Sequence, residues 1–323
     1  MLSPLLFLSP APAIKAQQQT AATQEQPAAN AKEVLQVRYY QRTLDAQLSD
    51  YESYWINLLR LTLEKSGKKF TLTAIDAKGV PHARLVSNLL NNGPANIIFM
   101  GTSKEMEEVL LPIRIPVFRG LVGYRIMMTT REKREIFAGI SSLKGLRKAI
   151  IGLGLNWPDE PIMKEAGLQV VTLPYYRLFN ALAGGRFHGV SRAAHEIKGE
   201  HDILKQTKTN LVIDDNLVLA YRLATFFFVS PDNQALADAL RDGLEKAYRD
   251  GSFLAYFNRH PAVHNAIKLL EDPDRKWFWL KNNHLSEQSQ KIPDEYWHAH
   301  PVDHKKHNKA PGEGGNKLAL DRH

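Results

Sequence analysis

The sequence predicts an α/β protein built from two lobes. The chain has 323 residues, which is long for one domain and suits two. Residues 34–100 alternate short β-type runs with amphipathic helical runs, in the order strand, helix, strand, helix, strand. The same alternation returns over residues 149–213. Because β-α-β units build parallel sheets with helical crossovers, two such series predict two sheets, one in each lobe.

The first series has clear start and stop signals for its long helix. Ser49 and Glu52 have the spacing of a capping box, and Gly67 ends the run. Between them, Trp55, Leu58, Leu59, Thr62 and Leu63 share one helical face. The other elements expected here are strands at 34–40, 70–75 and 96–100 and helices at 82–90 and 105–110.

The second series contains shorter elements. We expect strands at 149–152, 169–173, 188–191 and 211–213 and helices at 159–166, 175–183 and 193–200. A strongly β-forming run at 223–229 follows, then a long helix with Asp232 as its cap and Gly251 at its end. A short helix is expected at 252–259.

Composition limits the function classes. The net charge is +8, but the basic residues are scattered and form no stripe with interleaved aromatics, which favours a solvated surface over nucleic-acid binding. The chain has no cysteine, which excludes disulfides, thiolate catalysis and cysteine-ligated metal sites. No serine-hydrolase, zinc-protease or P-loop motif is present, and Gly152-Leu-Gly154 lacks the third glycine of a dinucleotide site. We therefore expect no enzyme activity and no cofactor.

We expect both ends of the chain to lie outside the folded part. Residues 1–16 are apolar with small residues at Ala11 and Ala13, typical of an export signal, although a basic start is missing. Residues 17–32 are expected to be a flexible leader, and 301–323 a disordered tail rich in His and Lys. His300 and His304 have chelating spacing, but Pro301 argues against a helix there, so no metal site is expected. No later stretch is long and apolar enough to span a bilayer.

Three short motifs in order carry a family resemblance. They are Ser-Leu-Lys-Gly at 142–145 before a glycine loop, Leu-Phe-Asn-Ala-Leu-Ala-Gly-Gly-Arg-Phe at 178–187, and the Asn-Gln-Ala-Leu helix start at 233–236. The chain resembles the type 2 periplasmic (extracytoplasmic) solute-binding proteins of the amino-acid-binding family 3 type over most of residues 33–260. One departure is His188, where the family usually carries an aspartate.

The resemblance implies a two-lobed fold with two crossover (hinge) segments. Lobe 1 would combine residues 33–126 with 223–300, and lobe 2 would comprise 127–222. The first crossing is expected near 126–130, and the run around 219–230 would return the chain to lobe 1.

Strand ends and helix starts in such sheets are where ligands bind, and they supply the candidate site residues. Arginines could grip a carboxylate, aromatic rings could form flat walls, hydroxyls could donate hydrogen bonds, and a glutamate could receive an amine. Each also has a structural alternative, as a surface charge, a core ring or a helix cap. The expected ligand-binding residues are Tyr40, Thr102, Ser103, Arg119, Arg125, Trp157, Arg192 and Glu196.

The resemblance implies an exported, periplasmic, monomeric protein that closes on a small polar, amino-acid-like molecule and passes it to an ABC permease. The first alternative is a sensory module that acts through a separate receptor. The second is a dehydratase-like enzyme, for which His195 and Glu196 are the only nearby acid/base pair, although adjacent helix residues point apart. The third is a basic scaffold that binds cell-wall or nucleic-acid polymers.

Overall fold

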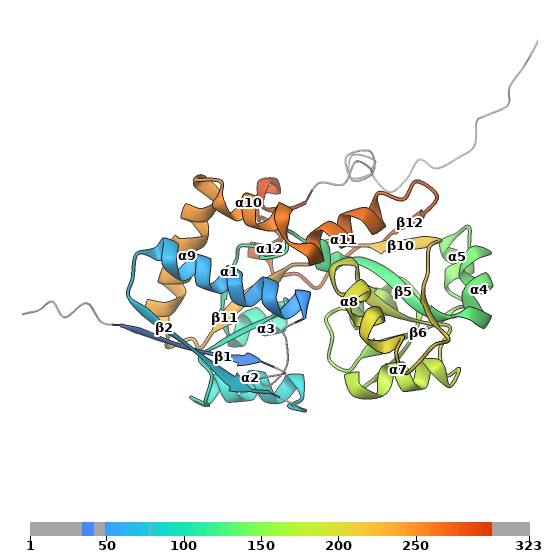
Figure 1. Cartoon of the computed structure of the whole chain (residues 1–323), viewed down its shortest axis with the longest axis horizontal. Coiled ribbons are helices and arrows are strands. Elements are labelled where there is room, and N and C mark those ends of the chain that lie inside the picture. The colour runs from blue at the N-terminus through green and yellow to red at the C-terminus, as the bar shows by residue number, and fades with distance from the viewer. Residues whose placement is uncertain (1–33, 42–48, 78, 299–323) are drawn as a thin grey trace, which may run out of the picture. The chain divides into compact units, whose positions relative to one another are not determined.

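The computed structural model describes residues 34–41, 49–77 and 79–298, and these form two β-sheets with helices around them (Figure 1). The expected signal peptide, leader and His-rich tail lie outside the described residues. In the described part, no helix is both long and apolar enough to cross a membrane.

The first sheet has five strands in the order β2-β1-β3-β11-β4. β1 is parallel to β2 and β3, whereas β11 runs antiparallel to β3 and β4. Its strands are β1 (Leu35–Gln41), β2 (Phe70–Asp76), β3 (Ile97–Gly101), β4 (Leu111–Ile113) and β11 (Thr225–Val229). The run at 223–229 therefore supplies β11, which lies between β3 and β4 in the sheet that the N-terminal series begins.

Five helices accompany this sheet. α1 begins where Ser49 Oγ accepts a hydrogen bond from the Glu52 amide at 3.2 Å and ends at Gly67, whose φ is 74°. This confirms both signals read from the sequence. α9 packs directly on α1, and its cap is Asn233 rather than Asp232. The helices are α1 (Asp50–Ser66), α2 (His82–Leu90), α3 (Lys104–Val109), α9 (Gln234–Arg249) and α10 (Ser252–Arg259).

The second sheet runs β12-β10-β5-β8-β6-β7, with β9 also paired to β5. Its central strand β5 (Tyr124–Thr130) is buried along its whole length. The other strands are β6 (Ile150–Gly154), β7 (Gln169–Leu173), β8 (Gly189–Ala193), β9 (Leu211–Ile213), β10 (Leu217–Ala220) and β12 (Lys276–Trp279). The helices around it are α4 (Arg134–Ala138), α5 (Leu143–Leu146), α6 (Asp159–Glu165), α7 (Tyr175–Ala183) and α8 (Ala194–Leu204).

Two short passages join the sheets. The first is residues 114–123, and it ends in the 3-10 turn η1 (Leu121–Gly123). It lies earlier than the predicted crossing at 126–130, because those residues belong to β5 inside the second sheet. The second passage is residues 221–224, between β10 and β11. A Cβ atom on Gly123 would lie 2.0 Å from the Tyr221 carbonyl oxygen, so glycine is required where the passages touch.

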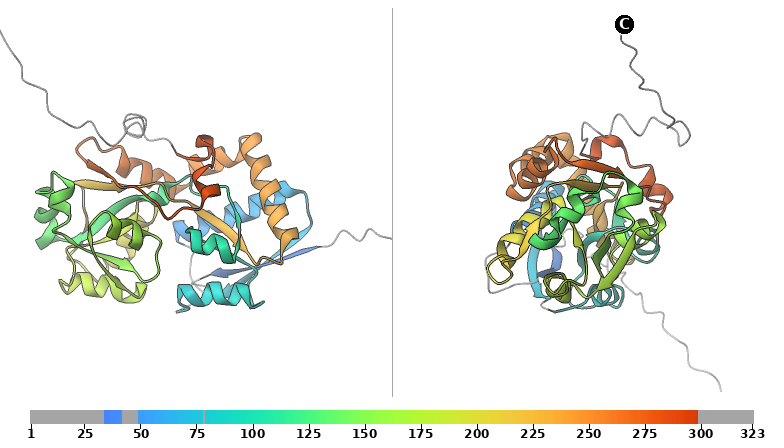
Figure 2. Two further views of the ribbon diagram at one scale, coloured as in Figure 1. Left: turned by 180° about the vertical axis from the view of Figure 1, so that it is seen from behind. Right: turned by 90° about the vertical axis from the view of Figure 1, so that its right-hand side faces the viewer.

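The C-terminal part of the chain adds elements that the sequence did not predict. α11 (Pro261–Leu270) packs against α8, and β12 pairs in parallel with β10. β12 thus extends the second sheet, although it lies in the stretch expected for lobe 1. The chain continues through α12 (Glu287–Gln290) to the 3-10 turn η3 (Asp294–Tyr296), and Figure 2 shows this segment from behind.

Candidate functional site

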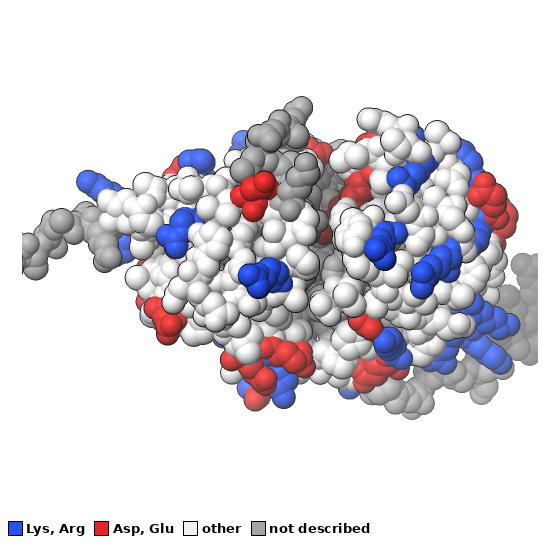
Figure 3. Space-filling model, turned by 90° about the horizontal axis from the view of Figure 1, so that it is seen from below, with Lys and Arg blue, Asp and Glu red and all other residues white. Residues whose placement is uncertain are grey.

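A cavity of about 490 Å³ is lined by residues from both sheets and their helices. One wall comes from β3, the start of α1 and the end of β1, including Tyr40, Tyr51 and Trp55. The opposite wall comes from β5, α6, α7 and α8. Figure 3 looks at the molecule from below and shows a hollow between two rounded halves, with charged residues of both signs near its edges. The volume suits a small molecule.

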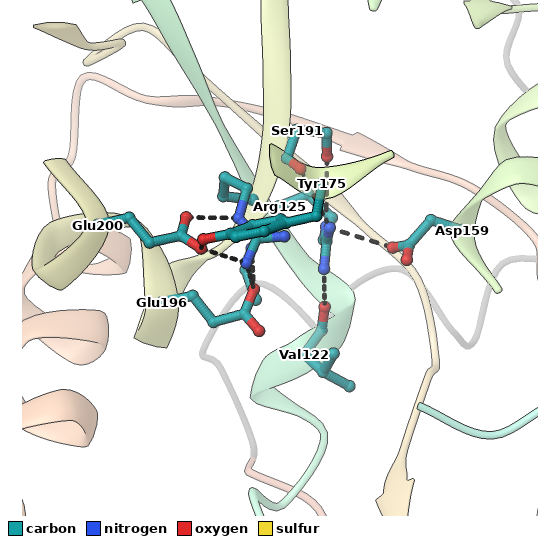
Figure 4. Close-up of polar contacts among 9 residues, drawn as sticks. Val122, Arg125, Asp159, Tyr175, Ser191, Glu196 and Glu200 are labelled. Carbon is teal, nitrogen blue, oxygen red and sulfur yellow. Dashed lines mark hydrogen bonds and ion pairs between the residues drawn. The ribbon is translucent and has the colours of Figure 1, made fainter. Parts of the chain in front are cut away.

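Arg125 on β5 forms one of two buried charge clusters in the wall (Figure 4). Its guanidinium lies 3.2 Å from the Asp159 carboxylate and donates to the Ser191 hydroxyl, the Ser191 carbonyl and the Val122 carbonyl. Asp159 is the first residue of α6 and also accepts a hydrogen bond from the Tyr221 hydroxyl. Burial and the neighbouring Asp159 charge raise the pKa of Tyr221, so this hydroxyl stays protonated as a donor. The Arg125 charge is therefore already paired inside the chain.

Arg192 on β8 forms the second cluster. Its guanidinium makes two hydrogen bonds to the Glu200 carboxylate, at 2.5 and 2.6 Å, and lies 2.8 Å from Glu196. The Tyr175 hydroxyl donates to Glu200 at 2.8 Å, and the Trp157 ring lies 4.4 Å from the guanidinium carbon. Burial alone would lower the pKa of Arg192, but Glu196 and Glu200 overcome it and raise that pKa. Burial likewise opposes ionisation of Glu196, yet Arg192 holds its pKa below the usual value.

His195 lines the cavity and carries a buried ring nitrogen that has no hydrogen-bond partner among the described residues. It is 5% exposed, its ring stacks on Phe118 at 4.0 Å between centroids, and Tyr51 stacks at 5.8 Å. Its Nδ1 has no hydrogen-bond partner in the described part of the chain. Burial, helped by the charges of Arg125 and Arg192, lowers the pKa of His195 to about 4 against the opposing effect of Glu196. The ring is neutral at pH 7.

Five of the eight candidate residues meet at the cavity, namely Tyr40, Arg125, Trp157, Arg192 and Glu196. The other three are absent from its described lining and serve local structure. Thr102 donates to Glu107 at 2.6 Å, and Ser103 caps α3 by accepting from the Met106 amide at 3.3 Å. Arg119 donates to the backbone carbonyls of Glu295 and Trp297.

Sequence reasoning missed several cavity residues. Asp159 and Tyr175 are each the first residue of a helix that follows a strand, so the rule that favours helix starts could have found them. Glu200 lies one helical turn beyond Glu196, which would have been a second signal. His195 was considered only as half of an acid/base pair, whereas both it and Glu196 line the cavity.

The described residues contain no group of three or more His, Cys, Asp or Glu side chains that could hold a metal ion. His300 and His304 lie outside the described residues, whereas the neighbouring His298 is described. Its amide donates to the Arg119 carbonyl at 2.6 Å.

Comparison with protein-family models gives no match, and comparison with curated proteins gives none either. Solved structures do match. An ancestral arginine-binding protein bound to arginine has a TM-score of 0.50 and 16% identity, covering 70% of this chain and 98% of its own. An amino acid ABC transporter substrate-binding protein from Streptococcus pneumoniae, bound to L-arginine, has a TM-score of 0.51 and 14% identity, with 72% and 96% covered.

A histidine kinase sensor domain with similarity to periplasmic binding proteins matches equally well. Its TM-score is 0.50 at 17% identity, and the match covers 71% of this chain and 96% of that one. At these identities the likeness shows the fold alone. The chain therefore has the mixed α/β, two-lobed fold of the type 2 periplasmic binding proteins, as the sequence predicted.

Proposed function

We propose that this chain is an exported solute-binding protein that closes on a small polar, amino-acid-like molecule and presents it to an ABC permease. The observation that carries the proposal is the cavity, because both sheets contribute to its lining. A solute that contacts both walls favours the closed arrangement by its difference in affinity for the closed and open states. The solved structures that share the fold include substrate-binding proteins of amino acid transporters.

The same proposal covers the organisation of the chain. Residues 1–16 would direct export to the periplasm, and the lobe built on the first sheet would move against the lobe built on the second sheet about the two passages. The boundary expected between residues 126 and 127 would then lie in the first passage, at 114–123. β12 would move with lobe 2, because it pairs with β10.

A sensory role is the second candidate, and the histidine kinase sensor domain of the same fold favours it. A sensor of this kind would bind its ligand in the same cavity and pass the closure to a separate receptor. The two roles differ in the partner and not in the ligand site.

Ligand binding is tested by thermal denaturation of the purified full chain with amino acids, polyamines and small carboxylates, followed by calorimetric titration. A true ligand raises the melting temperature saturably and is recovered unchanged. At a concentration 100 times its Kd it stabilises the folded state by about 2.7 kcal/mol. Conversion of a ligand into product would support the enzyme alternative, and no shift with any compound would contradict the binding proposal.

Two substitutions of aromatic residues, one in the cavity wall and one outside it, test where the ligand binds. Trp157→Ala removes a ring from the cavity wall, and we expect it to weaken binding at least tenfold, by about 1.4 kcal/mol or more. Tyr176→Ala is the control, because Tyr176 is 72% exposed and absent from the described lining. Equal affinities for the two variants would place the ligand elsewhere.

A further inference from the structure

The cavity wall contains more negatively charged side chains than positively charged ones among the described residues. The described lining contains five carboxylates, against three permanently charged cations. The carboxylates are Asp50, Glu52, Asp159, Glu196 and Glu200. On the wall formed by the first sheet and α1, the described residues include Asp50 and Glu52 but no lysine or arginine. Among the described residues, the charges that this wall offers a ligand are negative.

The cations of the opposite wall are already paired with carboxylates of the chain. Arg125 binds Asp159, Arg192 binds both Glu196 and Glu200, and Lys198 pairs with Asp202. A ligand carboxylate could bind Arg125 or Arg192 only by displacing one of these buried partners. Such displacement is unfavourable, because it leaves a buried charge of the chain without its partner.

Two further features of the wall favour a ligand that is positively charged and donates hydrogen bonds. The Nδ1 atom of the buried His195 has no hydrogen-bond partner among the described residues, and burial keeps the ring neutral at pH 7. A neutral imidazole has one nitrogen that can accept a hydrogen bond. The rings of Tyr51, Trp55 and Trp157 also line the cavity, and aromatic faces attract cations.

We propose that the ligand is a small organic cation, a protonated amine or guanidinium on a flat or apolar body, and that it carries no carboxylate. Its N–H groups would donate to His195 Nδ1 and to the exposed Asp50 carboxylate at the start of α1. This inference rests on the proposed solute-binding function and narrows its ligand from amino-acid-like molecules to the corresponding amines.

Matched ligand pairs test the inference by calorimetric titration of the full chain. Agmatine is compared with arginine, and phenethylamine with phenylalanine, since each pair differs by one carboxylate. We expect at least one amine to bind ten times or more tighter than its amino acid. Equal or tighter binding of the amino acids would overturn this inference and leave the solute-binding function standing. Binding of neither class in the whole panel would overturn both.

A charge substitution tests the contribution of α1. Asp50→Asn removes one exposed carboxylate of the cavity wall, and we expect the Kd of the amine to rise about 2- to 5-fold, with a smaller effect at high salt. Asp242→Asn is the control, because Asp242 is exposed on α9 and absent from the described lining. An unchanged Kd in Asp50→Asn would contradict the predicted contact with α1.

Discussion

At the scale of single residues, the cavity wall is organised by buried charges that pair with each other. Arg125, Asp159, Arg192 and His195 are all buried, and the two arginines are satisfied by carboxylates and backbone carbonyls. Such a network resists local rearrangement, because each member that moves leaves a buried partner unpaired. His195 differs, since burial keeps it neutral and its Nδ1 has no hydrogen-bond partner within the described part of the chain.

The buried neutral state of His195 makes stability depend on pH. In the unfolded chain a histidine takes up a proton near pH 6.5, whereas the pKa of folded His195 is about 4. The unfolded state therefore binds more protons between these values, so the stability is fully present above pH 6.5 and is lost as the pH falls toward 4. The groups that act on the ring are Glu196 on its own helix and Arg125 and Arg192 on the neighbouring strands.

His195→Phe keeps the stacked ring and removes this titration. From pH 7 to pH 5 the unmodified chain should lose about 2 kcal/mol of unfolding free energy more than the variant does, measured by urea denaturation at both pH values. His264→Phe, at an exposed position on α11, is the control and should follow the unmodified chain. Parallel losses in His195→Phe and the unmodified chain would show that His195 takes up its proton at the same pH in the folded and unfolded states, and the predicted effect of burial would be wrong.

At the scale of elements, the contact between α1 and α9 depends on a glycine. A Cβ atom on Gly243 would lie 1.9 Å from the Thr62 carbonyl oxygen of α1. The two helices bury Leu58, Leu59, Leu240 and Leu244, and burying a leucine contributes about 1.5–3 kcal/mol. The close approach made possible by Gly243 therefore supports the packing of the first sheet's helix layer.

Two glycine-to-alanine substitutions should have opposite effects. Gly243→Ala forces α9 away from α1, and we expect it to destabilise the fold by about 1–3 kcal/mol. Gly199→Ala, inside α8 with open space around the new methyl group, should stabilise it by up to about 1 kcal/mol. Urea denaturation of both variants checks the signs, and stabilisation by Gly243→Ala would contradict the close helix contact.

Local signals explain which elements could be predicted from the sequence. Ser49 and Gly67 mark the ends of α1 because capping acts within one helical turn. β12 was missed because its four residues are too short to show periodicity, and its partner β10 is distant in sequence. At the cavity, Arg125 and Arg192 could be named from the sequence because arginine can bind a carboxylate through two hydrogen bonds and both lie at strand ends. Their pairing with Asp159 and Glu200 follows from tertiary packing, which no local pattern contains.

At the scale of the whole described chain, the two passages between the sheets are held by the C-terminal segment 292–298. Arg119 in the first passage donates to the carbonyls of Glu295 and Trp297, and the Trp297 ring fills the space beside Gly120. In the second passage, Arg222 donates to the Ile292 carbonyl and places its guanidinium carbon 4.3 Å from the Trp297 ring. The segment 292–298 thus contacts both passages, which together form the proposed hinge.

Residues 283–289, which precede this segment, also contact helices that accompany the two sheets. The Asn283 side-chain amide and the His284 ring form hydrogen bonds with the Glu165 carboxylate of α6. The hydroxyl groups of Ser286 and Ser289 donate hydrogen bonds to the Glu107 carboxylate of α3. Glu107 also accepts from Arg114 at the start of the first passage. Because this C-terminal chain links elements of both sheets, it should limit how far the passages can bend during closure.

Hydrogen exchange can measure this restraint directly. Arg222→Gln removes the contact with Trp297 and weakens the contact with Ile292, which together are worth about 1–2 kcal/mol. We expect amides of residues 221–224 and 292–298 to exchange about tenfold faster in the variant, because local opening no longer breaks these contacts. Arg177→Gln is the control, since Arg177 lies over an exposed tyrosine ring on α7, away from both passages. Unchanged exchange in Arg222→Gln would show that the passages hold their shape without the C-terminal segment, and the predicted restraint on closure would then be wrong.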